Sequence, residues 1–411
     1  MAIARRGRLT GLHEYRAEIL ARIHPLEPLE LALLEALGCV LADDVTTDAP
    51  VPRMTRATAD GFAVVAGLVR PDAEMRIIGA ASAGDRTDEE VGAGEAVRVA
   101  SGAPIPAGAD AVIPHGAATE RGDRVTVAQV PSPDAYVRPT GAEFAAGQTV
   151  VGAGRRLGAP DLGMLAAVGR ADVMVHPRPR VVVLSTGDEV VEPGAPLGRD
   201  QLYDANSYAL TAAAREAGAT GYRRPIVPDD PAQVRDAFEG ALLNADLIVV
   251  TGGTSDGPDD HVRQVMSELG DVAIRRVGIE PGSSQLFGFL GEGEHPVPAF
   301  GLPGDPVSAF VAFEIFVRPA LRVMQGRTDV NRTRVTAVLD EPVSSAADHV
   351  SFERVRLERR DDGWHAVPTG GRQGTSLASV VAAHGLAEVP ADRTDVTPGE
   401  QVIVHLLVEA T

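Results

Sequence analysis

Residues 181–189 read VVVLSTGDE, an apolar run that passes directly into a turn with two hydroxyls and two carboxylates. The same form recurs where residues 247–250 (LIVV) lead into residues 251–260 (TGGTSDGPDD). It recurs again where residues 300–302 lead into the turn 303–306 (PGDP). Short continuous apolar runs that end in glycine-rich turns are typical of strands buried on both faces. The three stretches therefore predict a parallel sheet with polar loops at the carboxyl ends of its strands.

Apolar residues recur at helical spacing between these runs, in segments 205–217, 261–269 and 307–324, and residues 273–277 suit a further strand. Strands that alternate with helices indicate βαβ units whose sheet is covered on both faces. We therefore expect an α/β domain between Arg180 and Arg327.

The flanking segments have a different character. Apolar residues from Thr10 to Asp44 recur at helical spacing, which predicts a helical opening interrupted around Pro25 and Pro28. Short β-like runs follow Pro50. These β-like runs are 62–65, 75–78 and 96–99. A helix and a strand are expected in 157–175. Alternating segments, typical of strands, follow at 335–339, 352–357 and 401–408.

The expected fold class is multidomain α/β plus β, with a central α/β domain whose sheet is mainly parallel. A helical N-terminal segment, a small β-rich domain and a closed or curled C-terminal β-domain complete it. The expected parts are domain I (1–50 and 147–176), domain II (51–146), domain III (177–327) and domain IV (328–411).

Composition excludes several classes of protein. Asp and Glu number 57 against 38 Lys and Arg, so the formal charge of -19 argues against nucleic acid as a partner. The single cysteine, Cys39, lies in an apolar pattern, which predicts a place in the core and no structural disulfide. No apolar run approaches the ~20 residues that span a bilayer. We expect a cytoplasmic protein with no direct membrane insertion.

The polar turns suit a phosphorylated ligand. Gly252 and Gly253 let backbone NH groups approach an anion, and the hydroxyls of Thr254 and Ser255 can add donors. The turn 303–306 precedes a helix, whose N-terminus favours negative charge. Any single turn of this kind serves backbone geometry as often as ligand binding, but three at one edge favour a ligand.

Carboxylates among these turns suggest a cation. Asp188, Glu189 and Asp260 would repel phosphate unless Mg²⁺ bridges them, bound by carboxylates and substrate phosphates together. Helix capping is the alternative for Asp259 and Asp260, which precede the helix expected from His261.

The order and spacing of several motifs resemble the MoeA proteins of molybdenum cofactor synthesis and the C-terminal, or E, domain of gephyrin. The resemblance covers nearly the whole chain. The matching segments are Asp60-Gly61-Phe62-Ala63-Val64, 101–106 (SGAPIP) with 108–112, 184–189 (LSTGDE), 203–206 (YDAN), 252–255 (GGTS) and 303–308 (PGDPVS).

The resemblance implies an elongated homodimer of four-part subunits, with an α/β part similar to molybdopterin-binding domains. It implies a reaction in which adenylylated molybdopterin is hydrolysed with Mg²⁺ while molybdate is inserted into the dithiolene. It gives catalytic roles to Asp60, Glu189 and Asp260, and metal binding to Asp188, Glu189 and Asp260. The residues expected to bind the nucleotide and pterin are Ser101, Gly102, Ser185, Thr186, Gly187, Asp188, Gly252, Gly253, Thr254, Ser255, Pro303 and Gly304.

Some positions depart from the family pattern. Glu280 and Ser283 stand where that pattern has lysines near the pyrophosphate and molybdate, although Arg275 or Arg276 could supply one positive charge. Asp305 replaces an asparagine and either adds a charge or caps the next helix. His115 stands at a position where the family pattern commonly has a glutamate.

Two functional hypotheses follow. The first is the transferase that the resemblance implies. The second is a catalytically degenerate, gephyrin-like dimeric scaffold that binds the peptide tail of a cytoskeletal, cell-division or membrane-receptor partner, because acidic surface and altered anion sites suit a protein tail. An unrelated phosphate-ester hydrolase would require the motif order to be a coincidence.

Overall fold

The structure, a computed structural model, describes residues 9–254, 260–293, 295–370 and 376–408. The chain divides into two compact units. The larger unit comprises Met1–Glu30, Gly38–Ala42 and Met174–Thr411, and the smaller unit comprises Leu31–Leu37 and Asp43–Val173. Within the described residues, no helix is both long and apolar enough to cross a membrane.

The larger unit is built on a mixed sheet of six strands in the order β17-β14-β18-β22-β21-β19. The strands are β14 (Arg180–Ser185), β17 (Thr220–Arg223), β18 (Leu247–Thr251), β19 (Gly270–Arg276), β21 (Ser284–Leu290) and β22 (Val297–Leu302). The first four in spatial order are parallel, and β21 runs antiparallel to both of its neighbours. The link from β19 to β21 is too short for a parallel crossover, which needs a dozen or more residues. The expected mainly parallel sheet is confirmed.

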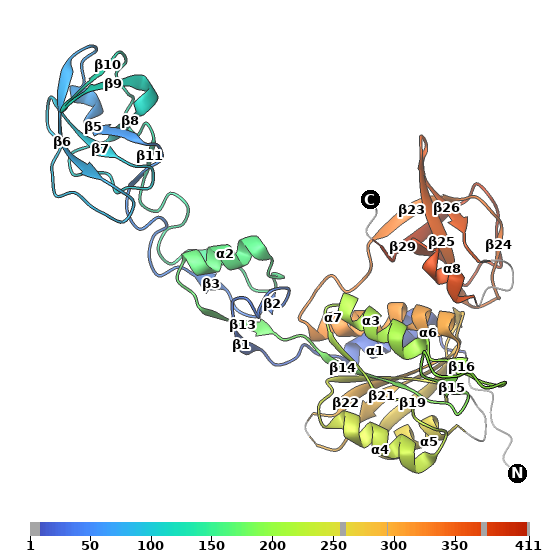
Figure 1. The fold of residues 1–411 in the computed structure, drawn as a ribbon. Helices are drawn as coiled ribbons and strands as arrows, with labels where there is room; N and C mark the ends of the chain where they lie inside the picture. The colour runs from blue at the N-terminus through green and yellow to red at the C-terminus, as the bar shows by residue number, and fades with distance from the viewer. Residues whose placement is uncertain (1–8, 255–259, 294, 371–375, 409–411) are drawn as a thin grey trace, which may run out of the picture. The chain divides into compact units, whose positions relative to one another are not determined.

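Helices cover both faces of this sheet, as expected (Figure 1). One face carries α4 (Pro231–Leu242) and α5 (His261–Leu269). The other carries α1 (Leu12–Arg22), α3 (Asn206–Glu216), α6 (Pro306–Ala312) and α7 (Arg318–Met324), the last two joined by the π-helical turn Phe313–Val317. The valines of β14 alternate between the two cores, so this strand is buried on both faces.

The expected helical opening is only half correct. Helix α1 forms, but the segment after Pro28 folds as β1 (Leu29–Ala32), a series of turns and β2 (Val40–Leu41). Pairing of β2 with β13 (Asp172–His176) buries Val40 and Leu41, while Leu34 is 85% exposed. Tertiary pairing thus overrides the helical spacing in this segment. Cys39 is buried, as predicted.

The smaller unit is rich in short strands, as expected. Its main sheet has the order β8-β5-β7-β6-β10-β9. The strands are β5 (Gly61–Val64), β6 (Glu74–Ala81), β7 (Glu95–Val99), β8 (Ala111–Pro114), β9 (Ala118–Arg121) and β10 (Arg124–Val127), with the short strands β3 (Val45–Thr46), β4 (Arg56–Ala57), β11 (Val137–Arg138) and β12 (Thr149–Val151) and the helix α2 (Ala159–Ala167) elsewhere in the segment.

The C-terminal part of the larger unit is a closed sheet, because β27 pairs with β25 as well as with β29. Its strands are β23 (Arg334–Leu339), β25 (Val350–Arg360), β26 (Gly363–Pro368), β27 (Gly385–Val389) and β29 (Gln401–Leu406), and β20 (Ile279–Glu280) adds to β25. The remaining elements are β24 (Val343–Ser344), β28 (Asp395–Val396) and α8 (Leu377–Val381). Closure leaves few open strand edges, and the expectation of a closed or curled β-domain is confirmed.

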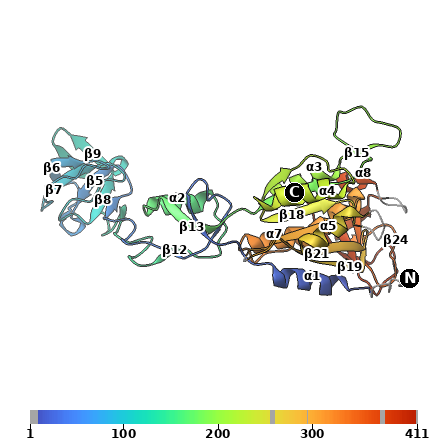
Figure 2. The same ribbon diagram turned by 90° about the horizontal axis from the view of Figure 1, so that it is seen from below.

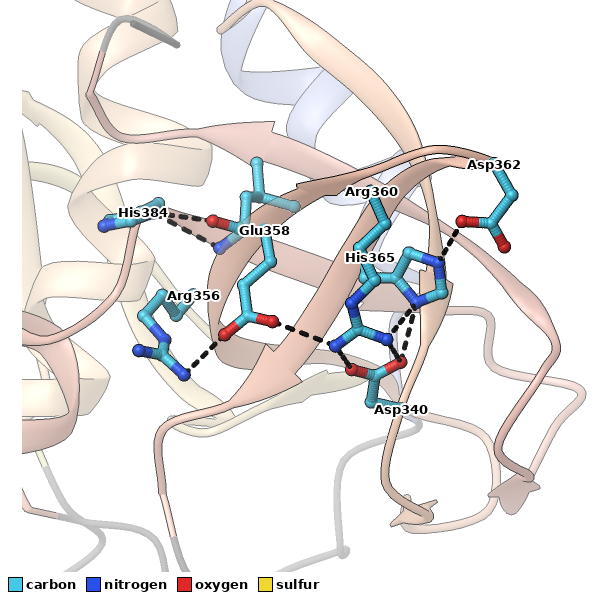
Figure 3. Close-up of polar contacts among 8 residues, drawn as sticks. Asp340, Arg356, Glu358, Arg360, Asp362, His365 and His384 are labelled. Carbon is cyan, nitrogen blue, oxygen red and sulfur yellow. Dashed lines mark hydrogen bonds and ion pairs between the residues drawn. The ribbon is translucent and has the colours of Figure 1, made fainter.

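A charged cluster joins β25 and β26 to Asp340, the residue that follows β23 (Figure 3). The ring of His365 on β26 lies between two carboxylates, with Nδ1 2.8 Å from Asp340 Oδ1 and Nε2 3.0 Å from Asp362 Oδ1. Arg360 at the end of β25 pairs with Asp340 and Glu358. The hydrogen bonds to Asp340 and Asp362 raise the pKa of His365, because both ring nitrogens then favour carrying a proton.

This arrangement predicts a loss of stability at alkaline pH. A histidine whose pKa is raised by folding contributes stability that is complete below its unfolded pKa of about 6.5 and is lost as the pH rises through the folded pKa. Between pH 6 and pH 9, the melting temperature of the wild type should therefore fall more than that of His365→Gln. Fluorescence of Trp364, the single tryptophan, reports unfolding of this strand directly. The exposed control His24→Gln should keep the wild-type pH dependence, and equal slopes for wild type and His365→Gln would contradict the role of the cluster.

Candidate functional site

Three polar turns begin side by side at the carboxyl ends of β14, β18 and β22. Ser185 is in register with Thr251, and Thr251 is in register with Leu302. Because the three strands are parallel neighbours, the turns that follow them share one edge of the sheet. This is the arrangement that the sequence predicted.

Glycines bring the backbones of these turns into contact. Gly252 has φ +88°, and a Cβ there would lie 2.7 Å from the carbonyl oxygen of Thr186. A Cβ on Gly304 would lie 3.7 Å from the Cα of Gly252. The side chain of Asn206 at the start of α3 donates a hydrogen bond of 2.7 Å to the carbonyl of Gly304. Backbone therefore forms the floor of the site, where a ligand can approach NH groups closely.

Hydroxyls at the ends of β14 and β18 point into the fold. Ser185 Oγ donates to Asp204 Oδ1 at 3.0 Å, and Thr186 Oγ1 donates to the carbonyl of Thr251 at 3.3 Å. Thr254 is buried as well, and its Oγ1 donates to the carbonyl of Leu302. A direct ligand role for Ser185, Thr186 and Thr254 remains a prediction.

The carboxylates of the first turn are exposed. Asp188 and Asp229 exchange hydrogen bonds, with the Asp229 NH donating to Asp188 Oδ1 at 3.1 Å and the Asp188 NH to Asp229 Oδ2 at 3.4 Å. The carboxylate of Glu189 lies over Gly187, whose φ of 138° disfavours any residue with a side chain there. Glu189 is thus exposed at the sheet edge, next to Gly187.

Asp260 caps helix α5, as predicted by the capping alternative to metal binding. Its Oδ1 accepts a hydrogen bond of 3.2 Å from the NH of Arg263, at the N-terminus of α5, and its side chain is buried. Ser255 and Asp259 lie outside the described residues. Among the residues that the structure describes, no group of three or more His, Cys, Asp or Glu side chains could hold a metal ion. The carboxylates of Asp188, Glu189 and Asp260 do not by themselves form a Mg²⁺ cage.

The segment 279–284, which departs from the family pattern, packs against the third turn, but the carboxylate of Glu280 points away from that turn. Gly282, with φ +92°, packs so closely that a Cβ would lie 2.9 Å from Ser308 Cβ and 3.1 Å from Pro303 Cγ. The carboxylate of Glu280 instead accepts hydrogen bonds from the NH of Ala346 and the hydroxyl of Ser351, on the closed C-terminal sheet. Glu280 is thus an anchor between β20 and β25.

The departure Asp305 and the possible compensating residue Arg275 both have plain structural partners. Asp305 caps α6, because its Oδ2 accepts hydrogen bonds from the NH and the hydroxyl of Ser308. Arg275 lies 3.8 Å from Glu18 of α1, an exposed ion pair. The capping alternative for Asp305 is therefore confirmed, and Arg275 is engaged with α1.

Asp60 and Ser101 meet in the smaller unit. The NH of Ser101 donates to Asp60 Oδ1 at 2.7 Å, and Gly102, with φ +82°, turns the chain at this point. Asp60 lines a hollow of about 350 Å³ together with Arg98 and His115, whose ring packs edge-on against Phe62. The structure therefore places the predicted site residues in two groups, one in each unit.

Sequence reasoning assigned no role to Asp204, Asn206 or Arg223. Asp204 is 3% exposed and binds Ser185 as well as the NH and hydroxyl of Ser207. The spacing of Asp204 and Ser207 before an apolar helical segment is the signal for a helix cap. Nothing in the spacing indicates that the same carboxylate also holds Ser185.

The close approach of the turns predicts a sharp contrast between two glycines. Gly252→Ala should lower the free energy of unfolding by several kcal/mol, because a positive φ and a backbone clash act together. Gly240→Ala, inside α4 with no atom near its Cβ, should stabilise the protein by up to about 1 kcal/mol. Urea denaturation of both variants measures the difference. Equal stabilities would show that the turns can separate without cost.

Comparison with known proteins agrees with this architecture. Residues 10–169 match the MoeA N-terminal region (domain I and II), residues 182–323 a probable molybdopterin binding domain, and residues 336–407 the MoeA C-terminal region (domain IV). The chain is 38% identical to molybdopterin molybdenumtransferase 1 and 32% identical to molybdopterin molybdenumtransferase 2 of Mycobacterium tuberculosis. These alignments cover 98% and 96% of this chain and 100% and 99% of the relatives.

A solved structure of a molybdopterin biosynthesis MoeA protein from Pyrococcus horikosii superimposes with a TM-score of 0.82 at 30% identity, covering 97% of this chain and 99% of that one. Sequence identity, fold and the order of all three matched regions agree from end to end. The chain belongs to the MoeA family of molybdenum cofactor biosynthesis.

Proposed function

We propose that this chain inserts molybdate into adenylylated molybdopterin and releases AMP. The observation that carries the proposal is the contact of three turns at the edge of the sheet, where Gly252 and Gly304 leave backbone exposed for close approach of phosphate. The curated relatives named molybdopterin molybdenumtransferase support the choice of substrate.

Release of AMP breaks a phosphoanhydride bond and consumes one water, so a base must accept a proton from that water. Two carboxylates suit this role. Glu189 is exposed at the sheet edge of the larger unit, and Asp60 lines the hollow of the smaller unit with one oxygen fixed by the NH of Ser101. A fixed carboxylate beside a hollow has little freedom to lose when a substrate binds.

Magnesium belongs to this proposal as an ion that arrives with the substrate phosphates. Asp188 and Asp260 each have an oxygen occupied by a backbone NH, so phosphate oxygens would have to complete the coordination.

The proposed function also includes a homodimer. Large apolar side chains are exposed on β16 (Leu202–Tyr203), α3 and β17, namely Leu202, Tyr203, Tyr208 and Tyr222. A partner subunit typically covers a surface of this kind.

Assay of AMP released from adenylylated molybdopterin, with Mg²⁺ and molybdate, tests the proposal. We expect turnover by the wild type and a loss of roughly 100-fold or more in Asp60→Asn and in Glu189→Gln, because each removes a group of the proposed acid–base chemistry. The exposed control Asp123→Asn, in the smaller unit, should retain full activity. A folded wild type that releases no AMP would refute the enzyme and favour a scaffold.

A second candidate, a scaffold for a peptide tail, has its own supporting observation. A cavity of about 70 Å³ lies between α1, the π-helical turn and the closed C-terminal sheet. Apolar residues such as Leu12, Phe352 and Leu386 line it together with Arg16 and Arg334. The carboxylates of Glu314 and Glu388 also line it, but they are bound by Arg332 and His405. In a chain of net charge -19, arginines beside an apolar cavity suit an acidic segment with one apolar anchor.

Fluorescence anisotropy with labelled acidic peptides that carry one leucine or phenylalanine tests this candidate. Binding to the wild type should weaken roughly tenfold in Arg334→Glu, since one favourable charge pair becomes repulsive. Arg121→Glu makes the same charge change on the smaller unit and should leave the affinity unchanged. Absence of binding by every such peptide, or an equal effect of both variants, counts against the scaffold.

A further inference from the structure

Arg223, at the end of β17, contacts two carboxylates from different parts of the chain. Its guanidinium donates to both oxygens of Glu192, at 2.7 and 2.9 Å, and lies 3.6 Å from Asp204 Oδ2. It also lies 4.5 Å from the centre of the Tyr208 ring. Arginine suits this position because its planar fork binds a carboxylate with two hydrogen bonds and can stack on an aromatic ring.

These two carboxylates lie on either side of an excursion of the chain, Glu192 at its start and Asp204 directly after the strand that follows it. Residues 192–201 leave the body between β15 (Val190–Val191) and β16, and Figure 2 shows this loop extending beyond α3. The excursion is closed by a stem of two paired residues on each side. The NH of Leu202 donates to the carbonyl of Glu189, and the NH of Asp204 donates to the carbonyl of Val191, both at 2.9 Å. The two strands run parallel, so Glu192 and Asp204, which directly follow them, lie at the same end of this stem, and Glu189 precedes β15 at the opposite end.

The stem carries the carboxylate that the proposed reaction uses. Glu189 immediately precedes β15, and its carbonyl is one acceptor of the stem. Two residues on each side make a weak ladder, because isolated pairs of short strands are marginal in water. An additional tether is needed to hold Glu189 in one place, and the described residues supply it at Arg223.

We propose that Arg223 is a positioning residue: by binding Glu192 and Asp204 together, it clamps the stem of the 192–201 excursion and so fixes Glu189 at the edge of the sheet. The proposal deepens the function proposed above and rests on it only for the role of Glu189. Asp204 extends the clamp inward, because it also accepts the hydroxyl of Ser185 at the end of β14.

The electrostatics favour a permanent clamp. Partial burial lowers the pKa of Arg223, but the hydrogen bonds and charge of Glu192, with Tyr208 and Asp204, outweigh this effect and raise it above its ordinary value. Arg223 compensates the negative charge of Asp204, whose side chain is only 1% exposed. A buried carboxylate without a positive neighbour would be costly, so removing the guanidinium disturbs both strands of the stem.

Hydrogen–deuterium exchange of the full-length protein tests the clamp without any substrate. In Arg223→Gln, amides in the segment 187–204, including those of Val190, Leu202 and Asp204, should exchange roughly tenfold faster, because charged hydrogen bonds are lost. Arg223→Lys, which keeps the charge but not the bidentate geometry, should give a smaller increase. The matched control is Arg215→Gln, since Arg215 donates to the carbonyl of Gly221 on the same strand and the structure gives it no bond to the stem.

Activity supplies the second arm. If Arg223 acts through Glu189, the double variant Arg223→Gln/Glu189→Gln should release AMP no more slowly than Glu189→Gln alone, a coupling that a merely structural residue does not show. Unchanged exchange in the segment 187–204 of Arg223→Gln overturns the clamp. If exchange rises across the whole larger unit instead, Arg223→Lys decides: exchange equal to wild type in that folded variant also overturns it. A wild type without AMP release refutes the proposed function but leaves the exchange result standing.

Discussion

In-register parallel pairing of β14, β18 and β22 is the constraint on which the rest of the larger unit depends. It sets three turns side by side, and their backbones approach so closely that a Cβ at position 252 would lie 2.7 Å from the carbonyl oxygen of Thr186. Glycine at 252 follows from that crowding. The same constraint turns the hydroxyls of Ser185 and Thr186 inward, because groups at the strand ends must still find hydrogen-bond partners.

Buried charge ties the closed C-terminal sheet to this core. Glu314 in the π-helical turn is bound by Arg318 and by Arg332, and Arg332 also donates to the carbonyl of Leu407. Burial raises the pKa of Glu314, but the hydrogen bonds and charges of the two arginines outweigh it and lower the pKa below the ordinary value. Such a network fixes geometry because every member must stay paired, so it joins the two parts of the larger unit with a defined orientation.

Arginine does similar work elsewhere in a chain without lysine. Arg223, Arg332 and Arg360 each contact at least two partners on different segments, a task that suits a planar group with five donors better than an ammonium. The carboxylate of Glu280 plays a similar part, because it accepts two hydrogen bonds that join β20 to the segment around β25. The departure from the family motif at Glu280 therefore has a structural explanation, because its partners Ala346 and Ser351 lie outside that motif.

The sequence by itself determined the elements with strong, continuous patterns. The apolar runs of β14 and β18 and the amphipathic spacing of α3 and α5 identify themselves, because burial on both faces or on one helical face leaves a local signature. The glycine-rich turns could be placed at one edge for the same reason, since parallel strands end together. Capping of α6 by Asp305 was also within reach, because a cap is a local interaction.

Only the tertiary structure decided the remainder. Residues 29–41 have helical spacing, yet pairing with β13 makes β2 a strand, and β21 becomes part of the sheet by pairing with β19 and β22. Asp204 binds Ser185, Arg223 binds Glu192 and Glu280 binds Ser351 across 19, 31 and 71 residues, and loop closure between such distant groups leaves no local pattern to read. Local propensity sets where strands and helices begin, whereas long-range pairing of charges and strands decides which of their side chains form the site.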